Sequence, residues 1–191
     1  MRYRFFLSAG MLFVWVTIVA ILGVFLMFPR IHSTWVLTGT QVLLYFAMVL
    51  PILVWSRTTF RDFASPKWQR LAAVLLAAGS LVIAAVIHHQ GIELIGAVVR
   101  VGVTAVGEEV IFRGFIWDRT RRAGWGAPLA IAVNVVAFAL WHIPSMLAGY
   151  SSASLGAFVV LCLVGLTLCV LRQVTGSLIL PTAAHFAIDI F

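Results

Sequence analysis

The sequence predicts an all-α fold, a polytopic membrane protein built as a bundle of about seven transmembrane helices. Composition is the first observation, because hydrophobic residues make up 63% of the chain and charged residues only 10%, whereas a soluble domain carries roughly 25% charged residues. The second observation is that the apolar residues form long runs separated by short polar loops, which is typical of spanning helices. At 191 residues the chain is one domain-sized unit.

Seven apolar segments follow one another along the chain. The first is too long for the hydrophobic region of a signal peptide and lacks a small-residue cleavage site, so we expect a mature helix. A spanning helix needs about 20 residues. The fifth and seventh segments are shorter, and we expect them to be tilted or sheltered by neighbouring helices. The segments are Phe5–Phe28, Trp35–Trp55, Leu71–Ile87, Ile92–Trp117, Leu129–Ile143, Leu155–Leu171 and Leu178–Phe191.

Most of the basic residues lie in every second loop between the predicted helices, on one side of the membrane. By the positive-inside rule, this alternation places the N-terminus in the cytoplasm and the C-terminus outside, in an inner or plasma membrane. The net charge of +7 would also suit nucleic-acid binding, but the charges are scattered, so we expect a lipid bilayer as partner and no nucleic acid. The predicted cytoplasmic loops carry Arg2, Arg4, Arg57, Arg61, Lys67, Arg70, Arg119, Arg121, Arg122 and Arg172.

Two of the six acidic residues, Glu108 and Glu109, stand side by side in the fourth segment. An ionisable group at bilayer depth costs roughly 2.5–3.5 kcal/mol on insertion scales, so the pair indicates a functional site. Neighbouring helical residues point about 100° apart, so we expect the two carboxylates to face different partners. Glu109 and Arg113 have the i, i+4 spacing and order of a favourable ion pair. Glu108 has no cation nearby in the sequence, which suits a group that transfers protons. Structural ion pairs with distant helices are the alternative.

Two histidines also belong to i, i+4 pairs in apolar segments. Phe138 precedes His142, and His185 precedes Asp189, whose carboxylate can fix the tautomer of a histidine one turn away. Either pair alone could be purely structural.

The estimated depths of these groups in the membrane favour a common site. Glu108 lies about ten residues, roughly 15 Å, from the predicted cytoplasmic surface, and His185 about eight residues, roughly 12 Å, from the same surface. We therefore expect Glu108, His142 and His185 to converge on a water-filled cavity. One carboxylate and two histidines suffice to activate water and stabilise an oxyanion, or to bind a divalent metal with an open position.

In these pairs the sequence resembles the CAAX protease and bacteriocin-processing family of intramembrane endopeptidases, also called the Abi family. The resemblance covers about residues 95–191, which would form the catalytic core. Residues 1–90 would add three peripheral transmembrane helices to the same single membrane domain. The family motifs Glu-Glu-x-x-x-Arg, Phe-x-x-x-His and His-x-x-x-Asn/Asp are matched in order by Glu108, Glu109 and Arg113; Phe138 and His142; and His185 and Asp189.

The resemblance implies a glutamate-type peptidase that hydrolyses a peptide bond near the membrane in a membrane-associated protein or peptide. Glu108 would act as the general base on a water shared with His142. Glu109 and Arg113 would hold the architecture of the site, while His185 and Asp189 would stabilise the oxyanion. Many members of the family have asparagine where this chain has Asp189, and an ionised aspartate cannot donate a hydrogen bond. Asp189 would instead orient His185, stay protonated or bind a metal.

Metal dependence and activity each leave an alternative open. We favour a mechanism without a cofactor, although the family was long described as metal-dependent. A zinc ion bound by Glu108, His142 and His185 is the alternative. A non-catalytic membrane scaffold or bacteriocin-immunity protein of the same fold is the alternative to an enzyme. The complete polar set favours the enzyme. Too few polar residues and no evident inverted repeat argue against a transporter.

Overall fold

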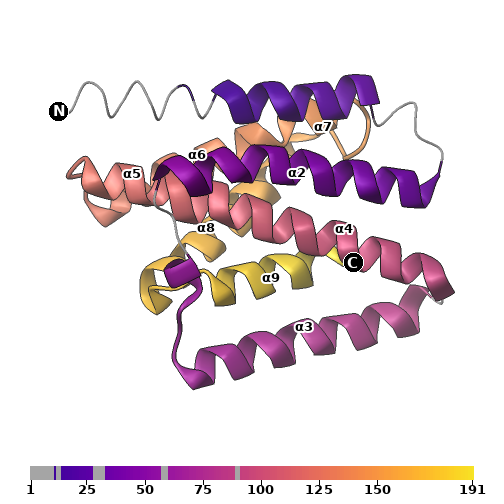
Figure 1. The fold of residues 1–191 in the computed structure, drawn as a ribbon. Coiled ribbons are helices and arrows are strands. Elements are labelled where there is room, and N and C mark those ends of the chain that lie inside the picture. The colour runs from indigo at the N-terminus through magenta and orange to yellow at the C-terminus, as the bar shows by residue number, and fades with distance from the viewer. Residues whose placement is uncertain (1–10, 12–13, 28–32, 57–59, 89–90) are drawn as a thin grey trace.

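The computed structural model describes residues 11, 14–27, 33–56, 60–88 and 91–191. Within this part of the chain the regular structure is entirely helical, so the predicted all-α fold class is confirmed (Figure 1). Among the basic residues used to predict topology, Arg2, Arg4 and Arg57 lie outside the described residues.

Each of the seven predicted segments is helical over most of its described length, and the exceptions are His142, Leu178, Ile190 and Phe191. Residues 14–21 are α-helical and lead into the π-helix η1 (Leu22–Met27). The later elements are α2 (Thr34–Ser56), the 3-10 helix η3 (Phe60–Phe63), α3 (Lys67–His88), α4 (Gly91–Glu109), the π-helix η4 (Val110–Ile116), α5 (Trp117–Arg122), α6 (Ala127–Trp141), α7 (Ile143–Leu147), α8 (Leu155–Thr175) and α9 (Ile179–Asp189).

Four stretches in the described residues are long and apolar enough to cross a membrane: Thr34–Val54, Lys67–Ile87, Ala127–Leu147 and Leu155–Thr175. The helix that ends the chain, α9, has only 11 residues. The protein is therefore a membrane helix bundle.

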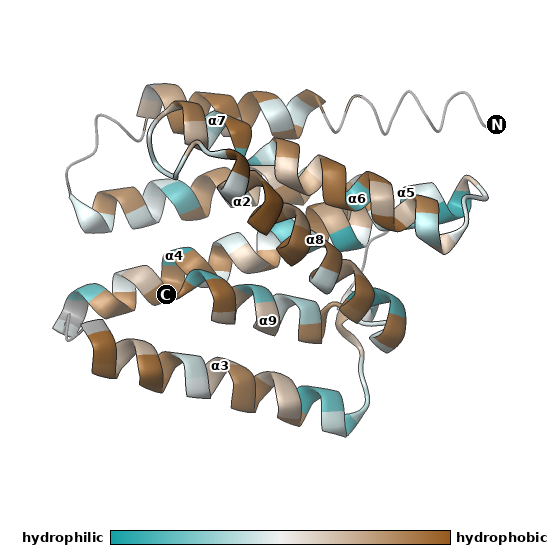
Figure 2. Ribbon diagram, turned by 180° about the vertical axis from the view of Figure 1, so that it is seen from behind, coloured by the Kyte–Doolittle hydropathy of each residue, from teal (hydrophilic) through white to brown (hydrophobic). Residues whose placement is uncertain are grey.

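The outer surface of the bundle is apolar. Hydrophobic residues run along most of α2, α3 and α8, whereas hydrophilic residues gather at α5 and at one end of α3 (Figure 2). Large side chains such as Val82, Leu155 and Val174 are exposed. An apolar surface this extensive on a soluble protein would drive aggregation, but it is compatible with lipid.

The centre of the bundle is formed by α4 and η4. These two elements pack against α2 and α9, and η4 also contacts α6 and α8 (Figure 1). The core cluster includes Ile111 and Phe112 of η4, Ile52 of α2 and Phe138 of α6. Buried polar residues lie beside this cluster on the same central helix, so the fold places them away from lipid on all sides.

The π-helix η4 differs from the continuous α-helix that the sequence predicts over 92–117. It begins at Val110, directly after the two glutamates. A π segment adds backbone per turn and is frequent at functional sites. The backbone oxygen of Arg113 in η4 accepts a hydrogen bond of 3.2 Å from Nε of Arg172 on α8, so a neighbouring helix supports the irregular segment.

Candidate active site

Glu109 is the centre of a fully buried ion pair. Its Oε1 accepts a hydrogen bond of 2.8 Å from Nη1 of Arg113, and both side chains have 0% exposure. The same oxygen lies 3.0 Å from Nδ1 of His185. The predicted i, i+4 ion pair is therefore confirmed. Glu109 also contacts His185, which the sequence did not indicate.

Arg113 is held on two further sides. Its Nη2 donates to the backbone oxygen of Gly165 at 3.1 Å, and its guanidinium carbon lies 4.4 Å from the ring centroid of Phe138. A Cβ at Gly165 would come within 3.2 Å of the Phe138 ring and 3.7 Å of Nη2. The glycine therefore lets α8 approach closely enough for its backbone to accept from a buried charge.

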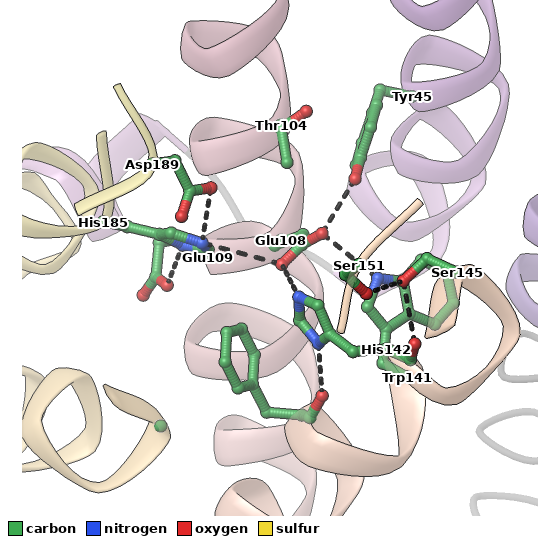
Figure 3. A network of polar contacts seen from close by, with 12 residues as sticks. Tyr45, Thr104, Glu108, Glu109, Trp141, His142, Ser145, Ser151, His185 and Asp189 are labelled. Atoms are coloured by element: carbon green, nitrogen blue, oxygen red, sulfur yellow. Dashed lines mark hydrogen bonds and ion pairs between the residues drawn. The ribbon is translucent and has the colours of Figure 1, made fainter. Parts of the chain in front are cut away.

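The two carboxylate oxygens of Glu108 have different surroundings. Oε1 accepts hydrogen bonds from the Tyr45 hydroxyl at 2.8 Å and from Nε1 of Trp141 at 3.1 Å. Oε2 is buried and has no hydrogen-bond partner among the described residues. It faces Nε2 of His142 at 3.9 Å and Nε2 of His185 at 3.7 Å (Figure 3).

His142 has a defined tautomer. Its Nδ1 lies 2.8 Å from the backbone oxygen of Phe138, and a carbonyl oxygen can only accept, so Nδ1 carries the proton. In the neutral ring, Nε2 is then an acceptor that faces Glu108. The sequence predicts His142 inside a helix, but α6 ends at Trp141 and His142 forms the junction with α7. Pro144, which has no backbone N–H to continue the α6 ladder, lies in the first turn of α7.

His185 lies between carboxylates. Its Nδ1 contacts Glu109 at 3.0 Å, and its Nε2 lies 3.3 Å from Oδ2 of Asp189 and 3.7 Å from Oε2 of Glu108. The expectation that Glu108 and Glu109 face different partners is therefore wrong. The two nitrogens of one imidazole point in different directions, so a single ring contacts both glutamates.

A cavity of about 160 Å³ opens beside Glu108 and His142. Residues from the N-terminal helical segment, α2, α4, α6 and α7 line it, and they include Gln41, Tyr45, Trp141 and Ser145. This volume admits several water molecules.

The zinc alternative would use Glu108, His142 and His185. No group of three or more His, Cys, Asp or Glu side chains in the described residues is placed to hold a metal ion. A catalytic zinc needs three protein ligands at about 2.0–2.2 Å from the ion. In the set proposed from the sequence, Oε2 of Glu108 lies 3.9 Å from Nε2 of His142 and 3.7 Å from Nε2 of His185.

The structure brings together all seven residues that the motifs single out. It adds Tyr45 and Trp141, which sequence reasoning missed. The available signal was polar side chains at Thr38, Gln41 and Tyr45, spaced along one face of an apolar segment. That pattern is also common at ordinary helix interfaces, so it does not point to a site by itself.

A comparison with protein families gives one match. The model described as type II CAAX prenyl endopeptidase Rce1-like matches residues 90–191. This range contains the two glutamates, Arg113 and both site histidines. No curated protein and no solved structure matches the chain.

Proposed function

This chain belongs to the type II CAAX prenyl endopeptidase Rce1-like family, and from that premise we propose that it is a glutamate-type intramembrane endopeptidase. It would hydrolyse a peptide bond near the membrane in a membrane-associated protein or peptide. The observation that carries the proposal is the position of Glu108. Its Oε2, which has no hydrogen-bond partner in the described part of the chain, faces the Nε2 atoms of two histidines at 3.7 and 3.9 Å.

In this proposal Glu108 and His142 activate one water. Polar atoms more than about 3.5 Å apart are suitably spaced for a bridging water. The water donates one hydrogen to Oε2 of Glu108 and the other to Nε2 of His142, which leaves its lone pair directed at the substrate. Glu108 takes a proton as the oxygen attacks the peptide carbonyl carbon. When the C–N bond breaks, that proton passes to the leaving nitrogen.

His185 stabilises the oxyanion in the same proposal. Glu109 accepts from Nδ1 of His185 and is itself held by Arg113, so the imidazole is fixed with Nε2 directed toward the reacting centre. An ionised Asp189 at 3.3 Å favours a proton on Nε2. That N–H donates to the carbonyl oxygen as negative charge develops. Loss of one such donor typically reduces kcat by roughly 10²–10³.

The mechanism needs no metal, and we propose it in that form. Glu108 and His142 accept hydrogen bonds from the water, and the charged His185 donates to the oxyanion. Protein groups therefore supply both functions. Asp189 acts as the residue that orients His185 rather than as a ligand.

The surroundings of the cavity support a membrane-associated substrate. An apolar groove of about 600 Å³ lies between the N-terminal helical segment and α6. It shares Ala20, Trp141 and Pro144 with the cavity beside Glu108. An apolar segment of a substrate in the groove would bring a neighbouring peptide bond to the polar cavity, and we infer a membrane-anchored peptide rather than a freely soluble one.

The proposal is tested with the purified protein in lipid vesicles. Each peptide of a panel carries one membrane helix, and the juxtamembrane sequence varies from peptide to peptide. Mass spectrometry detects the products. We expect cleavage at a bond near the membrane, and slower cleavage of the same sequences without the helix. Stable binding of the panel with no cleavage would instead indicate the non-catalytic scaffold.

A further inference from the structure

We propose that Tyr45 is a positioning residue for the reaction, acting together with Trp141 on Glu108. The inference rests on the proposed role of Glu108 as the base. Tyr45 belongs to α2, outside the residues 90–191 that match the family. The N-terminal half of the chain would therefore complete the site as well as surround it.

Both donors meet the same oxygen of Glu108. The Tyr45 hydroxyl approaches Oε1 from α2 at 2.8 Å, and the indole N–H of Trp141 approaches it from α6 at 3.1 Å. The terminal torsion of a glutamate is soft, so an isolated carboxylate turns easily. Two donors on Oε1 remove that freedom and leave Oε2 directed at His142 and His185 (Figure 3).

The backbone of α4 is built to admit the Tyr45 ring. A Cβ at Gly107 would lie 2.3 Å from Cδ1 of Tyr45, closer than real atoms approach. Only glycine allows the ring to pass at this height and reach the carboxylate of the next residue. The close approach is therefore a requirement of the Tyr45–Glu108 contact.

Two further hydrogen bonds join α2 to α4. Gln41 donates to Thr104 at 2.8 Å, and Arg100 donates to Thr38 at 2.9 Å. With the Tyr45–Glu108 contact they form a row in which each step advances about one helical turn along both helices. The Tyr45 hydroxyl at the end of this row meets Glu108.

The first test is kinetic. Tyr45→Phe removes the hydroxyl and keeps the ring, and we expect kcat to fall about tenfold with KM unchanged, because the lost interaction acts on the base rather than on the substrate. The double variant Tyr45→Phe/Trp141→Phe should lose more than the product of the two single effects, because either donor alone still holds Oε1. Thr38→Val is the matched control, since it removes an α2–α4 hydrogen bond of similar length away from the site.

The second test does not depend on peptidase activity. Dicyclohexylcarbodiimide labels protonated carboxyl groups in apolar surroundings, and hydrogen bonds to a carboxylate oppose its protonation. We expect Tyr45→Phe to accelerate labelling of Glu108, measured by mass spectrometry, with Glu109 as the internal reference and Thr38→Val unchanged. Thermal unfolding of each variant confirms an intact fold.

The two tests distinguish failure of the Tyr45 inference from failure of the proposed function. Unchanged labelling of Glu108 in Tyr45→Phe, unchanged kcat, or equal effects in Thr38→Val would each overturn the inference. Faster labelling of Glu108 in a protein whose wild type cleaves no peptide would retain the Tyr45 contact and reject the proposed function.

Discussion

At the scale of single residues, the two adjacent glutamates have different surroundings. Glu109 is enclosed by Arg113 and His185 and has no exposed surface. Glu108 has one oxygen held by two donors and one oxygen facing the two site histidines. We therefore expect the buried pair to maintain the geometry of the site and Glu108 to take part in the chemistry.

The first prediction concerns Glu109→Gln. The variant leaves the buried Arg113 without its counter-charge, which typically costs roughly 3–5 kcal/mol. We expect a clear fall in the thermal unfolding midpoint of the purified protein. Asp118→Asn is the control, because it breaks an i, i+4 pair with Arg122 whose side chains are 27% and 53% exposed. Equal unfolding midpoints for the two variants would contradict the structural role of Glu109.

At the scale of elements, the long apolar segments were predictable, and their irregularities were not. Every predicted segment is helical over most of its described length, because membrane depth demands internally satisfied backbone hydrogen bonds. The π-helix η4 is supported by a tertiary contact between Arg172 and the Arg113 backbone, which no local pattern encodes. The break at His142 is different, because it lies just before Pro144, whose effect the prediction of one continuous segment overlooked.

The second prediction concerns the α2–α4 interface. Gly107→Ala places a Cβ 2.3 Å from Tyr45, so either the ring or α2 must move. We expect a loss of about 1–3 kcal/mol in the free energy of unfolding, as for other overpacked sites, together with reduced cleavage. Gly102→Ala on the same helix is the control, since its Cβ meets nothing within 4 Å. If both variants behave like the wild type, the close approach is unimportant.

At the scale of the whole molecule, the sequence motifs identified most of the site residues but missed Tyr45 and Trp141. Glu108, His142 and His185 were placed together because their three segments each carry an i, i+4 pair at a similar estimated depth. Tyr45 was missed because α2 carries no motif, and a tyrosine among apolar residues is unremarkable in a sequence. Contacts between distant helices decide such contributions, and a single sequence does not record which helices pack together.

The third prediction concerns topology. With the N-terminus in the cytoplasm and seven spans, a reporter fused after Phe191 should read as external. A reporter inserted in the loop Thr58–Lys67 should read as cytoplasmic. If both report the same side, the count of spans is wrong by one.

The fourth prediction concerns metal. A protein whose water is activated by Glu108 and His142 should remain active after exhaustive chelation, and its metal content should be far below one ion per chain. Stoichiometric zinc, with activity lost on removal and restored on return, would instead make Glu108, His142 and His185 ligands.

The most direct test of the central claim is the cleavage rate of Glu108→Gln. Glutamine is nearly isosteric and can still accept from Tyr45 and Trp141, but it cannot take a proton from water. We expect kcat to fall by at least about 10²-fold, as for loss of a general base, with the thermal unfolding midpoint near that of the wild type. Glu93→Gln, which alters an exposed glutamate on the same helix, should leave both quantities unchanged. Full activity in Glu108→Gln would contradict the account.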